Sequence, residues 1–182
     1  MDNDAVNSRK IMRPTSPRPQ LSDLEARRIF ESIDRCELSG LLDRALIALI
    51  FHNHLRREDA LRLKVGDLFW EGKHAYLRVH QRTRLGHRED EFAMPCFPEA
   101  EAALIAYVEK AEIAADLRGP LFRTLDHRTG RVTSKPLSSI AAGLSINQHA
   151  RRAGIEREIS LREFRVAGAR LLKEQVSSGL II

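Results

Sequence analysis

The chain has 182 residues, of which 43% are hydrophobic and 30% are charged, which is enough apolar material for one domain with a core. Its 30 Lys and Arg exceed its 25 Asp and Glu and give a net charge of +5, a mild excess that is compatible with a nucleic-acid partner but does not require one. Its apolar runs are shorter than the roughly 18 residues that span a bilayer, and it starts without the layout of a signal peptide, so we expect a cytoplasmic protein with no membrane partner.

The first third of the chain predicts an irregular arm followed by three helices. Three prolines within residues 1–20 predict a disordered arm or linker. The stretch Ser22-Asp23-Leu24-Glu25 has the pattern of a capping box and opens a helix that runs to about residue 35. An apolar helix is predicted over 41–51, and a shorter one over 57–63.

The rest of the chain predicts a hairpin and three further helices. Alternating apolar and polar residues over 75–80 predict a strand, and 92–95 is the expected returning strand. The later patterns predict, in order, a helix over 98–113, an extended piece over 121–123, a turn over 126–131, and helices over 137–152 and 160–173. The expected fold class is α+β and mainly α-helical: a helical bundle with a small antiparallel hairpin or sheet. We expect one domain over 21–175 and a tail over 176–182.

Positive charge is concentrated in two tracts. Residues 73–88 hold five Lys or Arg and three histidines without a single acid. Residues 147–173 hold seven Lys or Arg against three Glu. Because the distribution of charge indicates a nucleic-acid surface better than net charge does, it matters that these two tracts hold most of the positive excess.

Four short motifs occur along the chain, and their order is more informative than any one of them. They are Leu55-Arg56 with Asp59 three residues later, Leu121-Phe122-Arg123, Ala153-Gly154-Ile155, and Arg162-Glu163-Phe164-Arg165. Together they resemble the catalytic domain of the tyrosine recombinases, or phage integrases, over residues 21–172. The resemblance implies the fold class expected above and a role in DNA recombination or integration.

The resemblance also implies roles for individual residues. Arg56 and Arg165 match the two arginines that donate paired hydrogen bonds to a DNA phosphate, and Asp59 matches the acid that orients the first of them. In the family, a lysine or histidine protonates the leaving oxygen while a tyrosine attacks the phosphorus. The tyrosine stores the bond energy, so no external cofactor is expected.

Three of the family's reactive groups are not found in their places. Arg162 stands where the family has a histidine, and arginine binds phosphate but does not transfer protons near neutral pH. The stretch 74–109 has no lysine where the family carries one at the hairpin tip; Arg84 is the nearest substitute, and Arg88 is a second cation there. Both tyrosines, at positions 76 and 107, precede the second arginine, whereas the family's nucleophile follows it.

These departures favour a double-stranded-DNA-binding relative of the recombinases without strand-cleaving activity. Its expected phosphate contacts are Arg56, Arg84, Arg88, Arg162 and Arg165, and a full-length recombinase or a second copy of the chain is a further expected partner. Two alternatives stay open: a fragment of an active site-specific recombinase, and a protein-interaction module that has lost DNA binding. The pair His52-x-His54 lacks a third ligand, so no metal site is expected.

Overall fold

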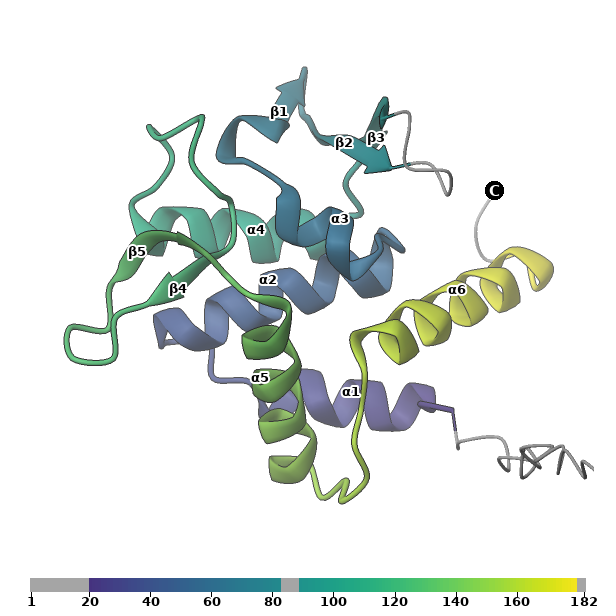
Figure 1. The fold of residues 1–182 in the computed structure, drawn as a ribbon. Helices are drawn as coiled ribbons and strands as arrows, with labels where there is room; N and C mark the ends of the chain where they lie inside the picture. The colour runs from purple at the N-terminus through teal and green to yellow at the C-terminus, as the bar shows by residue number, and fades with distance from the viewer. Residues whose placement is uncertain (1–19, 83–88, 180–182) are drawn as a thin grey trace, which may run out of the picture.

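The computed structural model describes residues 20–82 and 89–179, and they form a mainly helical fold with two small antiparallel sheets (Figure 1). The helices are α1 (Asp23–Ser32), α2 (Leu38–His52), α3 (Arg57–Arg62), the 3-10 turn η1 (Val65–Asp67), α4 (Pro98–Ala111), α5 (Ser139–Arg152) and α6 (Leu161–Ser177). The strands are β1 (Leu68–Glu71), β2 (His74–Arg82), β3 (Glu89–Pro95), β4 (Arg123–Leu125) and β5 (Val132–Pro136). The predicted fold class is confirmed. The predicted arm falls almost wholly outside the described residues, as do the last three positions of the predicted tail.

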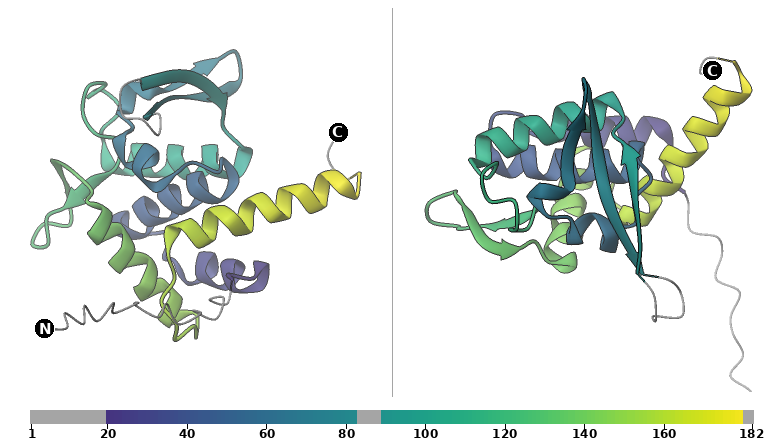
Figure 2. Two further views of the ribbon diagram at one scale, coloured as in Figure 1. Left: turned by 45° about the vertical axis from the view of Figure 1, so that its right-hand side comes forward. Right: turned by 90° about the horizontal axis from the view of Figure 1, so that it is seen from above.

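Helix α2 is the centre of the core. Every residue from Ala45 to Phe51 is buried, so the helix is apolar on all sides, as a helix surrounded by protein must be. Helix α4 packs on one side of it and α6 on another, while α1 and α5 close the lower part of the domain (Figures 1 and 2). The helix begins three residues earlier than the sequence predicted, at Leu38, and includes Gly40, whose backbone lies against the Asp34 carbonyl.

The three-stranded sheet has the order β1-β2-β3 and extends the predicted hairpin. Leu77 of β2 lies opposite Leu68 of β1 and Met94 of β3, so one face of the sheet presents apolar side chains to the core. Strand β1 was not predicted, because its four residues are too few to show an alternating pattern. The second sheet pairs β4 with β5 around the predicted turn over 126–131, and β5 was also missed.

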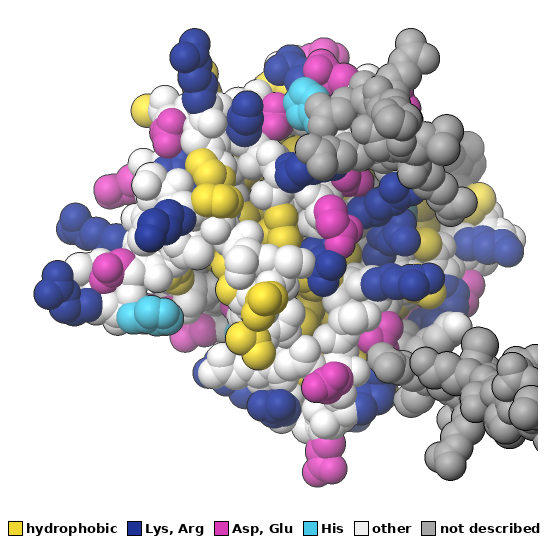
Figure 3. All heavy atoms as spheres, viewed as in Figure 1, with side chains coloured by type: hydrophobic (Ala, Val, Ile, Leu, Met, Phe, Trp, Pro, Cys, Tyr) yellow, Lys and Arg dark blue, Asp and Glu magenta, His cyan; other side chains and the backbone are white. Residues whose placement is uncertain are grey.

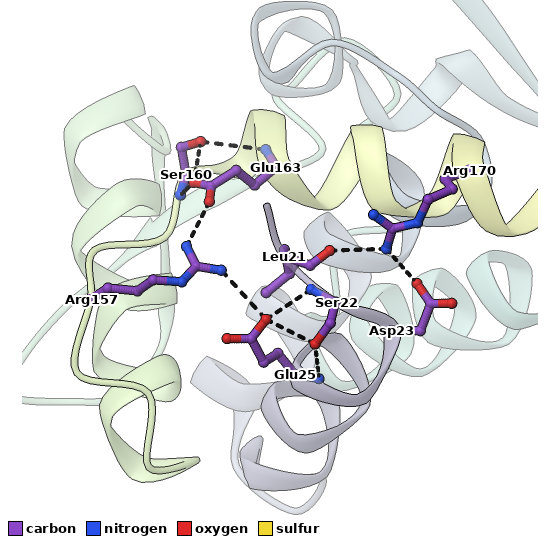
Figure 4. Close-up of polar contacts among 8 residues, drawn as sticks. All are labelled: Leu21, Ser22, Asp23, Glu25, Arg157, Ser160, Glu163 and Arg170. Carbon is purple, nitrogen blue, oxygen red and sulfur yellow. Dashed lines mark hydrogen bonds and ion pairs between the residues drawn. The ribbon is translucent and has the colours of Figure 1, made fainter. Parts of the chain in front are cut away.

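Both predicted capping patterns form at helix starts. Ser22 caps α1, Ser160 caps α6, and in each case the glutamate three residues later bonds back to the capping amide, at 2.8 Å. Arg157 joins the two caps: one nitrogen lies 2.7 Å from Glu163 and the other 3.5 Å from Glu25 (Figure 4).

Arg170 makes a second link between the same two helices. Its guanidinium donates to the Leu21 carbonyl at 3.0 Å and to Asp23 at 2.8 Å (Figure 4). The start of α1 is therefore tied to α6 through Arg170 and to the segment before α6 through Arg157. We call these two arginines and their partners the α1–α6 clamp.

Helix α6 also touches the end of α2 at very short range. A methyl group built on Gly168 would lie 1.9 Å from the Phe51 carbonyl oxygen, well inside any real contact. Edge-to-face contacts among Phe30, Phe51 and Phe164 surround this crossing, with ring centroids 5.7–6.4 Å apart. The glycine is therefore what permits the helices to approach this closely.

Among the described residues, none of the helices is both long enough and apolar enough to cross a membrane.

The crossing predicts a stability effect at Gly168. Gly168→Ala should lower the free energy of unfolding by about 1–3 kcal/mol or more, because the added methyl forces two backbones apart. Gly143→Ala is the matched control: position 143 lies within α5 with open space around it, so alanine should stabilise by roughly 0.5–1 kcal/mol through helix propensity. Urea denaturation of the three proteins measures both changes, and equal midpoints for the two variants would contradict this account of the crossing.

Candidate nucleic-acid interface

The junction between α2 and α3 places Arg56 at the surface. Helix α2 ends at His52, and His54 then adopts the left-handed conformation, with φ of 54°. Leu55 is buried and anchors the turn, so Arg56, the next residue, is exposed as the N-cap of α3. The buried Asn53 fixes the junction to the end of β3, since its amide donates to the Pro95 carbonyl at 2.8 Å.

The start of α6 supplies the other two predicted arginines. Leu161 and Phe164 are buried, so Arg162 and Arg165, each one position further along, project from the neighbouring side of the helix. Arg162 is exposed and Arg165 is half-buried. The capping box of Ser160 and Glu163 fixes where the helix begins, and hence where both arginines lie.

These two segments face each other across an open pocket of about 450 Å³, which we call the arginine pocket. Its lining residues are Leu55, Arg56, Arg57, Glu58, Ser160, Leu161, Arg162 and Arg165. The structure therefore brings Arg56, Arg162 and Arg165 together, although more than 100 residues separate the first from the other two. Arg57 is a fourth member that sequence reasoning missed, because nothing in the pattern distinguished it from a solvated surface arginine.

Positive potential dominates this pocket. The N-terminus of a 17-residue helix opens into it and adds the partial positive charge of unpaired amides to the four guanidinium groups. Glu163 opposes that charge, but Arg157, 2.7 Å away, offsets it. Figure 3 shows dark-blue side chains gathered over the start of α6 and the nearby α2–α3 junction.

Glu58 is the one acid among the described residues that line the pocket. Hydrogen bonding to its own backbone amide lowers the pKa of Glu58, and Arg57 and the charge of Arg165 lower it further. The Arg57–Glu58 pair, 2.6 Å apart, is exposed on both sides and thus screened by water. An exposed pair of this kind exchanges partners readily, which leaves Arg57 available to an incoming anion.

His54 precedes the pocket residue Leu55 in the chain, and the charge of Arg165 influences its pKa. Burial lowers the pKa of His54; the Phe51 backbone opposes this shift, and the charge of Arg165 adds a smaller lowering. Both ring nitrogens are buried without a hydrogen-bond partner. Within the described ranges, no group of three His, Cys, Asp or Glu is arranged to hold a metal ion, and His52 and His54 belong to no such group.

Asp59 takes a partner other than the one expected. Its buried carboxylate accepts a hydrogen bond from Arg62 at 2.7 Å, and Arg62 also donates to the His80 carbonyl at 3.0 Å. Arg62 thus ties α3 to β2, Asp59 holds the Arg62 guanidinium, and Asp59 does not line the arginine pocket. No bond between Asp59 and Arg56 occurs in the part of the chain that is described, so its orienting role toward Arg56 stays a prediction.

The remaining candidates lie elsewhere. Arg84 and Arg88 fall outside the described residues, between β2 and β3. Tyr107 is fully buried, where its hydroxyl accepts a bond from the Arg123 amide at 3.4 Å, and burial raises the pKa of Tyr107 to about 12. Tyr76 stacks on Phe69 in the three-stranded sheet. Neither tyrosine lines the arginine pocket.

Known proteins resemble this chain over most of its length. It is 30% identical over 129 residues to an integrase/recombinase xerD homolog of Selenomonas ruminantium, which covers 69% of this chain and 37% of that protein. It is 26% identical over 168 residues to tyrosine recombinase XerC of Pelotomaculum thermopropionicum, and this match covers 85% of this chain and 50% of that protein. The fold is similar to that of XerH site-specific recombinase bound to a palindromic difH substrate, with a TM-score of 0.60 and 22% sequence identity. The similarity covers 86% of this chain and 42% of the XerH chain.

The chain spans at most half the length of these curated relatives. A family model described as the phage integrase family matches residues 20–181, a range that includes every described residue. Because this match covers more than half of the chain, it shows that the chain belongs to the phage integrase family.

Proposed function

We propose that the chain binds double-stranded DNA through its phosphate backbone and does not cleave it. The observation that carries this proposal is the convergence of four arginines on the N-terminus of α6 in one open pocket. Guanidinium groups donate two parallel hydrogen bonds to a phosphate, and unpaired helix amides bind the same anion. The XerH structure of similar fold was solved with its difH substrate, which supports DNA as the polyanion.

The pocket has the groups for binding a phosphodiester but lacks those for breaking it. A cleavage step needs a nucleophile beside the phosphorus and an acid near the leaving oxygen. The hydroxyl of Ser160 is occupied with the capping box of α6, and the residues of 20–82 and 89–179 that line the pocket include no tyrosine, histidine or lysine. The role proposed for the chain is to occupy DNA or to regulate a full-length recombinase.

A second candidate function is part of an active recombinase. It is favoured by one observation, that the chain spans 37% and 50% of the lengths of its two curated relatives. In that case a segment beyond this sequence, or a second protein, brings the nucleophile to the arginine pocket. The two functions share the DNA-binding step and differ in whether a protein–DNA bond forms.

Removing two pocket arginines should abolish most of the DNA affinity. For Arg56→Ala with Arg165→Ala, we expect a loss on the order of 100-fold, since hydrogen bonds to charged groups contribute about 1.5–3 kcal/mol each. The slope of log affinity against log salt should fall by about 2, roughly 0.9 for each lost phosphate contact. Fluorescence anisotropy with a labelled duplex measures both quantities.

The control for this measurement removes the same charge elsewhere. Arg27 and Arg28 are exposed on α1 and take part in no ion pair among the described residues, so Arg27→Ala with Arg28→Ala should bind nearly as the unmodified chain does. Equal losses in the two double variants would show that net charge, rather than the arginine pocket, determines affinity.

The chain should bind DNA without forming a covalent bond to it. Incubation of the chain with a nicked suicide duplex should give no covalent protein–DNA adduct on a denaturing gel, because neither tyrosine reaches the pocket. An adduct formed by this chain alone would overturn the non-cleaving proposal while leaving DNA binding intact. An adduct that forms only with a longer product of the same reading frame would establish the second candidate.

A further inference from the structure

We propose that the hairpin formed by β4 and β5 is a second contact surface for the DNA backbone, separate from the arginine pocket. The side chains that form it are Arg128, Arg131 and Lys135, which we call the hairpin surface. The inference rests on the proposed function, since it assigns a further part of the same DNA to a further part of the chain.

Most of the basic side chains of this hairpin are exposed and have no acidic partner among the described residues. Residues 123–136 contain four Lys or Arg and one acid. Arg123 is buried and paired with Asp116 at 2.7 Å, so it is unavailable to a ligand. The three cations of the hairpin surface are exposed, and within the described ranges none of them forms an ion pair.

The single acid, Asp126, is engaged inside the turn. One of its carboxylate oxygens accepts bonds from the amides of Arg128 and Thr129, at 2.9 and 2.8 Å, and from the Thr129 hydroxyl at 3.0 Å. The bond from the Thr129 amide, with the others, lowers the pKa of Asp126. The carboxylate thus shapes the turn and forms no bridge to the neighbouring arginine side chains.

The turn between β4 and β5 is preorganised by hydrogen bonds within the chain. Gly130 takes the left-handed conformation that the turn requires, with φ of 68°, and its amide donates to the Asp126 carbonyl at 2.8 Å. The hydroxyls of Thr124 and Thr133 join the two strands at 2.6 Å. Because the backbone is already ordered, binding costs little beyond fixing the ends of the cationic side chains.

The hairpin lies at the edge of the same face as the arginine pocket. In Figure 3 dark-blue side chains gather over the start of α6 and again at the outer end of the β4–β5 hairpin on the left, with α5 between them. A duplex is a long polyanion with phosphates along its whole length, so one that is held at the pocket and directed along this face meets the hairpin surface. Exposed cations favour such a partner over an apolar protein surface.

The test compares two duplex lengths in the full chain. For Arg128→Ala with Arg131→Ala, we expect affinity for a duplex of about three helical turns to fall roughly tenfold, and its salt slope to fall by about 2. Affinity for a duplex of about one turn, held at the pocket alone, should not change. Arg128→Lys with Arg131→Lys should restore binding, since a phosphate contact needs the charge, and the Arg27→Ala with Arg28→Ala control should leave both lengths unaffected.

The outcomes separate this inference from the proposed function. If the hairpin variant binds the long duplex with unchanged affinity and slope, the hairpin surface is not a DNA contact, whatever the pocket variant does. If the Arg56 and Arg165 variant binds the short duplex normally while the hairpin variant loses the long one, the pocket assignment fails and the hairpin surface stands. Equal losses on both lengths in the hairpin variant would overturn the proposed division into two separate contacts.

Discussion

The crossing of α6 over the end of α2 is the contact on which the arginine pocket depends. Gly168 lets the backbone of α6 lie directly on the Phe51 carbonyl, and the three phenylalanine rings around it fix the angle. Two residues after Phe51 the chain turns through the Asn53–His54 junction toward Arg56. The same crossing therefore sets the positions of both halves of the pocket, one at the start of α3 and the other at the start of α6. The α1–α6 clamp holds the start of α6 from the opposite side through Arg157 and Arg170.

Gathering four arginines at one helix N-terminus has an electrostatic cost. Like charges repel, and the amides at the start of α6 add to the same potential. The chain offsets part of this through Glu58 and through Glu163, yet each of these acids already has an arginine partner of its own. A bound phosphate would offset the repulsion that remains. Burial, with a further contribution from the charge of Arg165, lowers the pKa of His54.

The sequence predicted those features that depend on local pattern. The capping boxes at Ser22 and Ser160 were readable because each cap is formed within four residues, and their positions then fixed the direction of Arg162 and Arg165. Arg56 was found through its place between two predicted helices.

Features that depend on distant partners were not predictable. Arg62, the partner of Asp59, donates to the His80 carbonyl only because β2 lies beside α3, and Arg57 belongs to the pocket only because α6 faces it. Arg128 and Arg131 looked like ordinary turn residues until the fold placed their hairpin on the face of the pocket.

The central claim, that a DNA phosphate is bound where these arginines converge, is tested most directly by nuclear magnetic resonance with a short duplex. The side-chain Nε–H signals of Arg56, Arg162 and Arg165, together with the backbone amide of Leu161 in the first turn of α6, report the pocket residue by residue. The account predicts that these signals shift together and saturate at one common affinity, while those of Arg27 and Arg28 stay in place. Saturable shifts confined to surfaces away from the pocket would contradict it.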